Sequence, residues 1–116
     1  TMSDLESMIT IEEARQLFEN WQNSRAQVIA DELGESDAHE FLFSLSELEQ
    51  YLQYVRANSS VVNPGIRIYL GAYGECGGNK ATVFLIPTKG TQASSENDYD
   101  LKAINRGLAG VPPRSF

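Results

Sequence analysis

The residues best suited to chemistry in this 116-residue chain are its single cysteine, Cys76, and its single histidine, His39. A thiol nucleophile needs a general base within hydrogen-bonding reach, and only His39 could supply an imidazole. In the expected sheet, the loop that contains Cys76 lies at the end where the strand starting at His39 finishes. About four residues at about 3.3 Å each, roughly 13 Å, would then separate the two side chains. No helix N-terminus is expected beside Cys76 to activate the thiol. An exposed loop cysteine is therefore the preferred interpretation, with a thiol-dependent enzyme as its alternative.

Glu35, Asp37 and His39 occupy alternate positions, so an extended segment would point all three side chains to one side, about 6.6 Å apart. Carboxylates with an imidazole can hold a divalent metal. Ligands at this spacing do not converge easily on one ion, and a polar turn explains the alternation more simply. We therefore expect no metal site here.

The glycine-rich segment 74–80 (Gly-Glu-Cys-Gly-Gly-Asn-Lys) is a candidate phosphate-binding loop only by composition. It lacks the required spacing and the Lys-Ser/Thr pair, and a strand follows it where a helix should. Its glycines suit a hairpin turn, where φ is often positive. The sequence predicts no cofactor.

Arg67, Tyr69 and Tyr73 form the most interesting cluster, because an extended strand would place all three on one face. Two aromatic rings and a guanidinium could hold an anionic or planar ligand, or a partner protein. These three residues are the candidate ligand-binding site. The alternative is an ordinary outer sheet face, or one covered by the C-terminal tail.

A long amphipathic helix is expected over residues 10–33. Thr10 and Glu13 fit a capping box, in which each side chain bonds the backbone N–H of the other. Arg25 would interrupt the apolar stripe, so we expect a kink or break near residues 23–24; a buried functional arginine is the alternative. The stripe, roughly 160° wide, contains Ile11, Ala14, Leu17, Phe18, Trp21, Val28, Ile29 and Leu33.

A short strand at residues 39–43 and a second helix are expected next. Ser44 and Ser46 each begin a capping box. Ser44 is the better N-cap, because Phe43 and Leu48 would then form a hydrophobic staple.

A β-hairpin is expected after this helix. Residues 66–73 alternate with a period of two, residues 74–80 form the turn, and residues 81–88 are apolar on both faces. A strand apolar on both faces is usually central in its sheet.

The charge of the chain is −7 and is unevenly distributed. Residues 1–50 carry 12 acidic and 2 basic side chains, whereas residues 51–116 carry 4 acidic and 7 basic ones. Nucleic-acid-binding proteins show a concentrated basic face instead, so no nucleic-acid partner is expected. The acidic half is either a solvated surface or a docking face for a basic protein partner.

The composition is that of an ordinary globular domain, with 41% hydrophobic and 22% charged residues. A single cysteine forms no intrachain disulfide, which favours a reducing compartment, and we expect the cytoplasm. No apolar run is long enough to span a membrane, and no signal peptide is recognisable, so no membrane association is expected.

Three stretches of the chain resemble a known group of proteins: residues 9–14 (Ile-Thr-Ile-Glu-Glu-Ala), 41–44 (Phe-Leu-Phe-Ser) and 65–71 (Gly-Ile-Arg-Ile-Tyr-Leu-Gly). The chain is similar to small uncharacterised bacterial proteins with an N-terminal helix, a Gly-Ile-Arg-Ile-Tyr strand and a tail containing Pro-Pro. The stretches cover about a third of this chain. Those proteins carry further cysteines near the tail, and this chain has none there. The resemblance implies a compact α+β domain and no particular function.

Together these elements predict an α+β fold with an N-terminal helix followed by β-α-β-β. The sheet is expected to be small, three-stranded and mixed or antiparallel, with strand 81–88 between 39–43 and 66–73. An irregular C-terminal tail follows.

Four segments are expected along the chain. Residues 1–9 form a disordered N-terminus, 10–89 a single α+β domain, 90–98 a flexible linker, and 99–116 a tail packed on the domain.

Three functions are compatible with these residues. The first is a non-catalytic protein-interaction domain with an acidic N-terminal half. The second is a small-molecule binding protein using the sheet face around Arg67, Tyr69 and Tyr73. The third is a thiol-dependent enzyme acting through Cys76. A homodimer through an exposed edge strand is also expected as an assembly.

Overall fold

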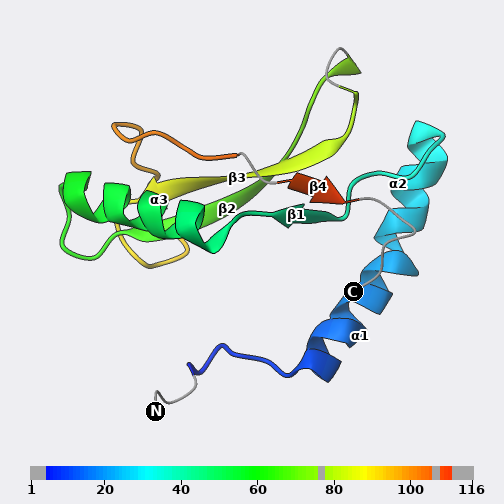
Figure 1. Cartoon of the computed structure of the whole chain (residues 1–116), viewed down its shortest axis with the longest axis horizontal. Coiled ribbons are helices and arrows are strands. Elements are labelled where there is room, and N and C mark those ends of the chain that lie inside the picture. The colour runs from blue at the N-terminus through cyan, green and yellow to red at the C-terminus, as the bar shows by residue number, and fades with distance from the viewer. Residues whose placement is uncertain (1–4, 76–77, 106–107, 111–116) are drawn as a thin grey trace. The chain divides into compact units, whose positions relative to one another are not determined.

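The computed structural model describes residues 5–75, 78–105 and 108–110 of the chain. The chain divides after Asp37 into two compact units, the first helical and the second, Ala38–Gly110, containing every strand that the structure describes (Figure 1). The predicted α+β class is therefore confirmed.

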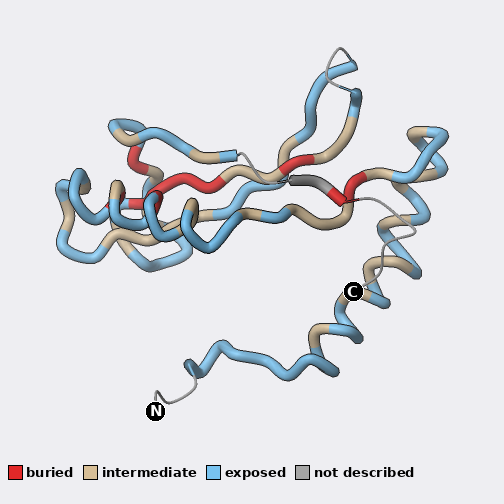
Figure 2. Tube along the Cα trace, in the orientation of Figure 1, coloured by how far each residue is buried: buried red, intermediate tan, exposed pale blue. Residues whose placement is uncertain are grey.

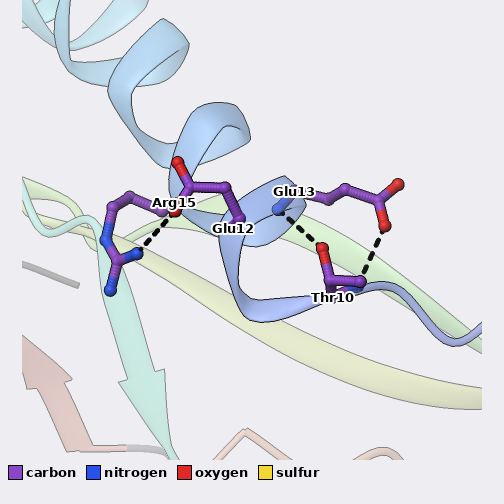
Figure 3. A network of polar contacts seen from close by, with 4 residues as sticks. All are labelled: Thr10, Glu12, Glu13 and Arg15. Atoms are coloured by element: carbon purple, nitrogen blue, oxygen red, sulfur yellow. Dashed lines mark hydrogen bonds and ion pairs between the residues drawn. The ribbon is translucent and has the colours of Figure 1, made fainter.

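The first unit contains helices α1 (Ile11–Gln22) and α2 (Arg25–Leu33). The predicted capping box is present: Glu13 N–H donates to the Thr10 hydroxyl at 3.0 Å, and Thr10 N–H donates to the Glu13 carboxylate at 3.1 Å (Figure 3). The hydrogen bonds between Thr10 and the Glu13 carboxylate lower the pKa of Glu13, and the bond from the Thr10 backbone contributes most.

The predicted break between the two helices is also confirmed. The Ser24 hydroxyl donates to the backbone O of Asn20 at 2.5 Å, a bond that competes with the helical ladder and bends helices. The break leaves Arg25 exposed at the start of α2, so the alternative of a buried arginine is wrong. Gly34, with φ of 78°, ends α2 in the left-handed conformation that glycine adopts without strain.

The second unit begins with strand β1 (Glu40–Leu42) and helix α3 (Leu45–Asn58). Ser44 caps α3 as predicted, since its hydroxyl accepts a hydrogen bond from Glu47 N–H at 3.0 Å. The two residues of the predicted staple, Phe43 and Leu48, both pack against the core of this unit.

Strands β2 (Gly65–Ala72) and β3 (Ala81–Thr88) form the predicted antiparallel hairpin, paired residue for residue from Gly65 with Thr88 to Ala72 with Ala81. The core lies on the face of the hairpin that α3 covers. Tyr51, Val55 and Leu85 are its buried members, and the longest run of buried positions among the described residues, 85–88, lies in β3 (Figure 2). The partly buried residues around them are Phe43, Leu48, Tyr54, Ile66, Leu101 and Ile104.

The predicted three-stranded sheet is not confirmed. β1 pairs with β4 (Leu108–Gly110), so the described strands form two antiparallel pairs. β1 does not flank β3, because the residues that follow β3 turn back and lie along the edge of β3 that β1 was predicted to occupy. Isolated bridges join Leu85 to Ile104 and Thr88 to Asn97. We call residues 89–105 the return segment.

Candidate functional site

The hairpin ladder places two of the three predicted site residues on one face of the sheet. Arg67 lies opposite Ile86 and Tyr69 opposite Phe84, so all four side chains project to the same side. Tyr73 follows the end of β2, and its backbone N–H continues the ladder by one step. This is the face opposite the helix-covered core.

Arg67 is held by the return segment. Its Nη1 donates to Asn97 Oδ1 at 2.7 Å and to the backbone O of Ser95 at 2.9 Å. Its Nη2 donates to the backbone O of Ala93 at 2.9 Å. A guanidinium has five N–H donors in a fixed planar arrangement, and three of them fit one short turn here. Arg67 therefore organises the turn.

Tyr69 contacts both the sheet and the return segment. Its ring stacks on Phe84, with centroids 5.2 Å apart and planes inclined by 11°. Its hydroxyl accepts a hydrogen bond from Asn97 Nδ2 at 2.9 Å, and Tyr99 Oη lies 3.3 Å from the same nitrogen. Because the amide oxygen of Asn97 faces Arg67, one side chain connects both predicted site residues to the return segment.

Tyr73 lies near the hairpin turn and does not share these contacts. Its hydroxyl is 3.4 Å from Thr82 Oγ1 and accepts a weak hydrogen bond from Asn105 Nδ2 at 3.3 Å. Asn105 also belongs to the return segment. All three predicted residues therefore contact it. The contacts of Arg67 come from residues 93–97, in the segment predicted to be a flexible linker, and not from the tail predicted to start at residue 99.

The start of the return segment is shaped by a close approach of backbone at Gly65. The Thr88 hydroxyl accepts from Gly65 N–H at 3.1 Å and donates to Gly90 O at 2.6 Å. A Cβ on Gly65 would lie 2.6 Å from that hydroxyl and 2.9 Å from Gly90 O, so only glycine fits. Thr88 is 4% exposed, which makes this junction part of the packed interior.

A shallow surface depression of about 560 Å³ lies between Arg67 and the return segment. Its charges are mixed, because both basic residues (Arg67 and Lys89) and acidic residues (Glu96 and Asp100) line it. Such a lining suits a zwitterionic or hydrogen-bonding group better than a simple anion. The lining residues are Arg67, Lys89, Ser95, Glu96, Asn97, Tyr99 and Asp100.

Two tyrosines of α3, which the sequence did not single out, hold the other end of the return segment. The Tyr51 hydroxyl lies 2.8 Å from the backbone O of Lys102 and 3.2 Å from that of Leu85. The Tyr54 hydroxyl accepts from Lys102 N–H at 2.8 Å. Burial, with a smaller contribution from Tyr54, raises the pKa of Tyr51 to about 12. The signal available beforehand was their spacing of three positions, which places both on one helical face.

The remaining candidates do not converge on a site within the described residues. His39 has a side chain only 2% exposed, with Nε2 3.6 Å from Glu40 Oε2. No group of three or more His, Cys, Asp or Glu side chains suited to a metal occurs in the described ranges. Cys76 lies outside the described residues, so the thiol hypothesis stays a prediction.

No protein-family model, curated protein or solved structure matches this chain. Among the described residues, no helix has the length and apolar character needed to cross a membrane.

Proposed function

We propose that this chain is a non-catalytic protein-interaction domain that presents α1 and α2 to a basic protein partner. The observation that carries the proposal is the exposure of the apolar stripe along these helices. Ile11 is 65% exposed, Leu17 61% and Val28 69%. Within α1 and α2, which are described throughout, no residue is fully buried.

An exposed stripe of this kind suits recognition of a helix in a groove. In that mode an amphipathic helix lays apolar side chains, spaced at three and four positions, into a hydrophobic groove. Burying one such side chain contributes about 1.5–3 kcal/mol. Leu17 and Val28 would therefore supply much of the affinity, with partly exposed Phe18 and Trp21 beside them in the groove.

The charge of the first half supports a basic partner. Residues 1–50 carry 12 acidic and 2 basic side chains. The acidic residues of α1 and α2 are all exposed, namely Glu12, Glu13, Glu19, Asp31 and Glu32. Complementary charge raises association rates and selects partners, with a strength that falls as salt increases. The partner groove is therefore expected to be apolar with a basic rim.

A small-molecule binding protein is the second candidate, favoured by the depression beside Arg67. Tyr99, 79% exposed, offers a free ring face there. Arg67 already donates three hydrogen bonds to the return segment, so Lys89 and Tyr99, which also line the depression, would have to contribute more to binding than Arg67. The single cysteine of the chain supports the cytoplasm as the compartment of either candidate.

The proposal is tested by comparing two double variants with the wild-type chain. A protein captured by the wild type at low salt is identified and its affinity is measured by titration calorimetry. Leu17→Ser with Val28→Ser should weaken binding by about a hundredfold, that is about 2.7 kcal/mol. Gln16→Ser with Gln27→Ser, on the polar face, is the matched control and should leave the affinity unchanged.

Salt gives the second readout of the same experiment. The wild-type affinity should fall as ionic strength rises, because opposite charges meet at the rim of the contact. Equal losses in both double variants, or an affinity independent of salt, would show that the acidic helices are not the docking surface.

A further inference from the structure

The outer edge of β2 carries backbone groups with no strand beside them. The backbone N–H of Tyr73 donates across the hairpin, toward the chain that leads into β3. Because the hydrogen-bonding direction alternates along a strand, the odd-numbered residues of β2 bond β3 and the even-numbered residues direct their backbone N–H and C=O groups outward. No hydrogen bond to the outward backbone groups occurs within the described part of the chain. The outward set is Ile66, Ile68, Leu70 and Ala72.

The opposite edge of the hairpin, along β3, is hydrogen-bonded to the return segment. Its pattern supports the assignment of which backbone groups face outward. On β3, Leu85 N–H donates to Ile104 O at 2.8 Å, and Ile104 N–H donates to Leu85 O at 3.0 Å. The return segment therefore pairs with the outer edge of β3 at Leu85, whereas no described strand pairs with the outer edge of β2.

The centre of the open edge is apolar and exposed. Ile68 is 67% exposed and Leu70 78%, although the alternating pattern predicts that both belong to the buried face. β2 pairs with β3 without a bulge, and its sequence contains no proline, lysine or acidic residue. Natural edge strands use such features to prevent edge-to-edge pairing. The only charge on β2, Arg67, is engaged by the return segment.

We propose that two copies of this chain pair antiparallel through β2, about a two-fold axis at Tyr69, to form a continuous four-stranded sheet. This surface is separate from α1 and α2, so the inference goes beyond the proposed function. A β-strand is the occupant that fits this edge, because the outward N–H and C=O groups are spaced to pair with a second backbone in extended conformation.

The register follows from the ladder and identifies the occupant as a second copy. Outward-facing residues must pair with outward-facing residues, and an axis at Tyr69 pairs Ile68 of each copy with Leu70 of the other. The two exposed apolar side chains of each copy then cover those of the second, on one face of the sheet. Arg67 falls opposite Gly71 of the other copy, so no like charges meet. The strand is complementary to itself.

Sedimentation equilibrium of the full chain, at concentrations up to about 1 mM, tests the proposal. The wild type should dimerise reversibly. The double variants Ile68→Lys/Leu70→Lys and Ile68→Glu/Leu70→Glu place four like charges together in each homodimer, and each should raise the dissociation constant by about a hundredfold. An equimolar mixture of the two should recover the dimer as a heterodimer. Val62→Lys, at an exposed apolar position outside the strand, is the control.

Amide hydrogen exchange of Leu70→Pro keeps the test independent of the charged variants. The Leu70 N–H points away from β3, so proline there removes a bond between copies and none within the hairpin. The wild-type amides of Ile68 and Leu70 should exchange more slowly as concentration rises, and Leu70→Pro should abolish that dependence for Ile68. A wild type monomeric at about 1 mM, dimerisation unchanged in the double variants, or a mixture that stays monomeric would overturn the proposal.

Discussion

Arg67 and Asn97 lie 30 positions apart in the chain and are joined by a hydrogen bond of 2.7 Å between Nη1 and Oδ1. The amide nitrogen of the same Asn97 donates to the Tyr69 hydroxyl at 2.9 Å. Both hydrogen-bonding groups of one side chain are therefore used to hold the return segment against the sheet. Arg67 and Tyr69, which the sequence singles out as candidate ligand-binding residues, therefore hold the return segment of their own chain against the sheet.

Replacing Arg67 should destabilise the second unit. Arg67→Ala removes three hydrogen bonds to the return segment and leaves their acceptors to water, which should cost about 1–3 kcal/mol. Urea unfolding followed by circular dichroism measures the change. Arg56→Ala, on the exposed face of α3, is the control and should change stability by less than about 0.5 kcal/mol. If Arg67→Ala leaves the stability unchanged, the three hydrogen bonds do not hold the return segment, and Arg67 would be available to bind a ligand.

Adding one methyl group at Gly65 should destabilise the fold more than the same change at Gly74. The Cβ of Gly65→Ala would lie 2.6 Å from the Thr88 hydroxyl and 2.9 Å from a backbone oxygen, whereas nothing lies within 4 Å at Gly74. Forcing this contact apart should cost about 1–3 kcal/mol. The difference between the two variants in thermal unfolding checks it, and equal midpoints would contradict the close approach at Gly65.

Tyr51 should ionise only in strong base. Its pKa is raised from 10.0 to about 12, so the folded state favours the neutral phenol. The corresponding stability is complete below pH 10 and is lost as pH rises toward about 12, because the unfolded chain ionises first. Ultraviolet titration should show one late tyrosine that disappears in Tyr51→Phe and persists in Tyr99→Phe. A late transition that survives in Tyr51→Phe would assign the shift elsewhere.

Thr10→Ala should weaken the start of α1 and release Glu13. Loss of an N-cap hydroxyl costs about 0.5–2 kcal/mol of helix stability. The lowered pKa of Glu13 should rise toward 4.5 when Thr10 no longer bonds it, which carboxyl chemical shifts report. In the wild type, the helix gains from this pair above pH 4.5 and loses that gain as pH falls through the lowered pKa. Ser60→Ala, at an exposed position, should leave the Glu13 titration unchanged.

Local features of the fold were predictable because their causes lie within a few residues. The Thr10 capping box, the choice of Ser44 over Ser46 as N-cap, and the break near Ser24 each depend on contacts three or four positions apart. The β2–β3 hairpin is nearly as local, since the alternating strands flank one short turn.

Distant pairings were not predictable in the same way. β1 and β4 are strands of three residues each, too short for a periodic signal, and the sequence paired β1 with β3 instead. The partners of Arg67 lie 26–30 positions away in a segment whose composition is typical of a linker. Composition does not reveal that carbonyl oxygens there will face a guanidinium. Whether residues 90–98 are flexible in solution stays a prediction.

The most direct test of the proposed function places a photo-reactive amino acid on α1 and asks which face meets a partner. With the label at Leu17, 61% exposed on the apolar stripe, irradiation at low salt should link the chain to one basic protein. With the label at Gln16, on the polar face, the same protein should not be linked. Cross-linking of that protein from Gln16 but not from Leu17 would contradict the account, and so would a linked partner whose yield is unaffected by salt.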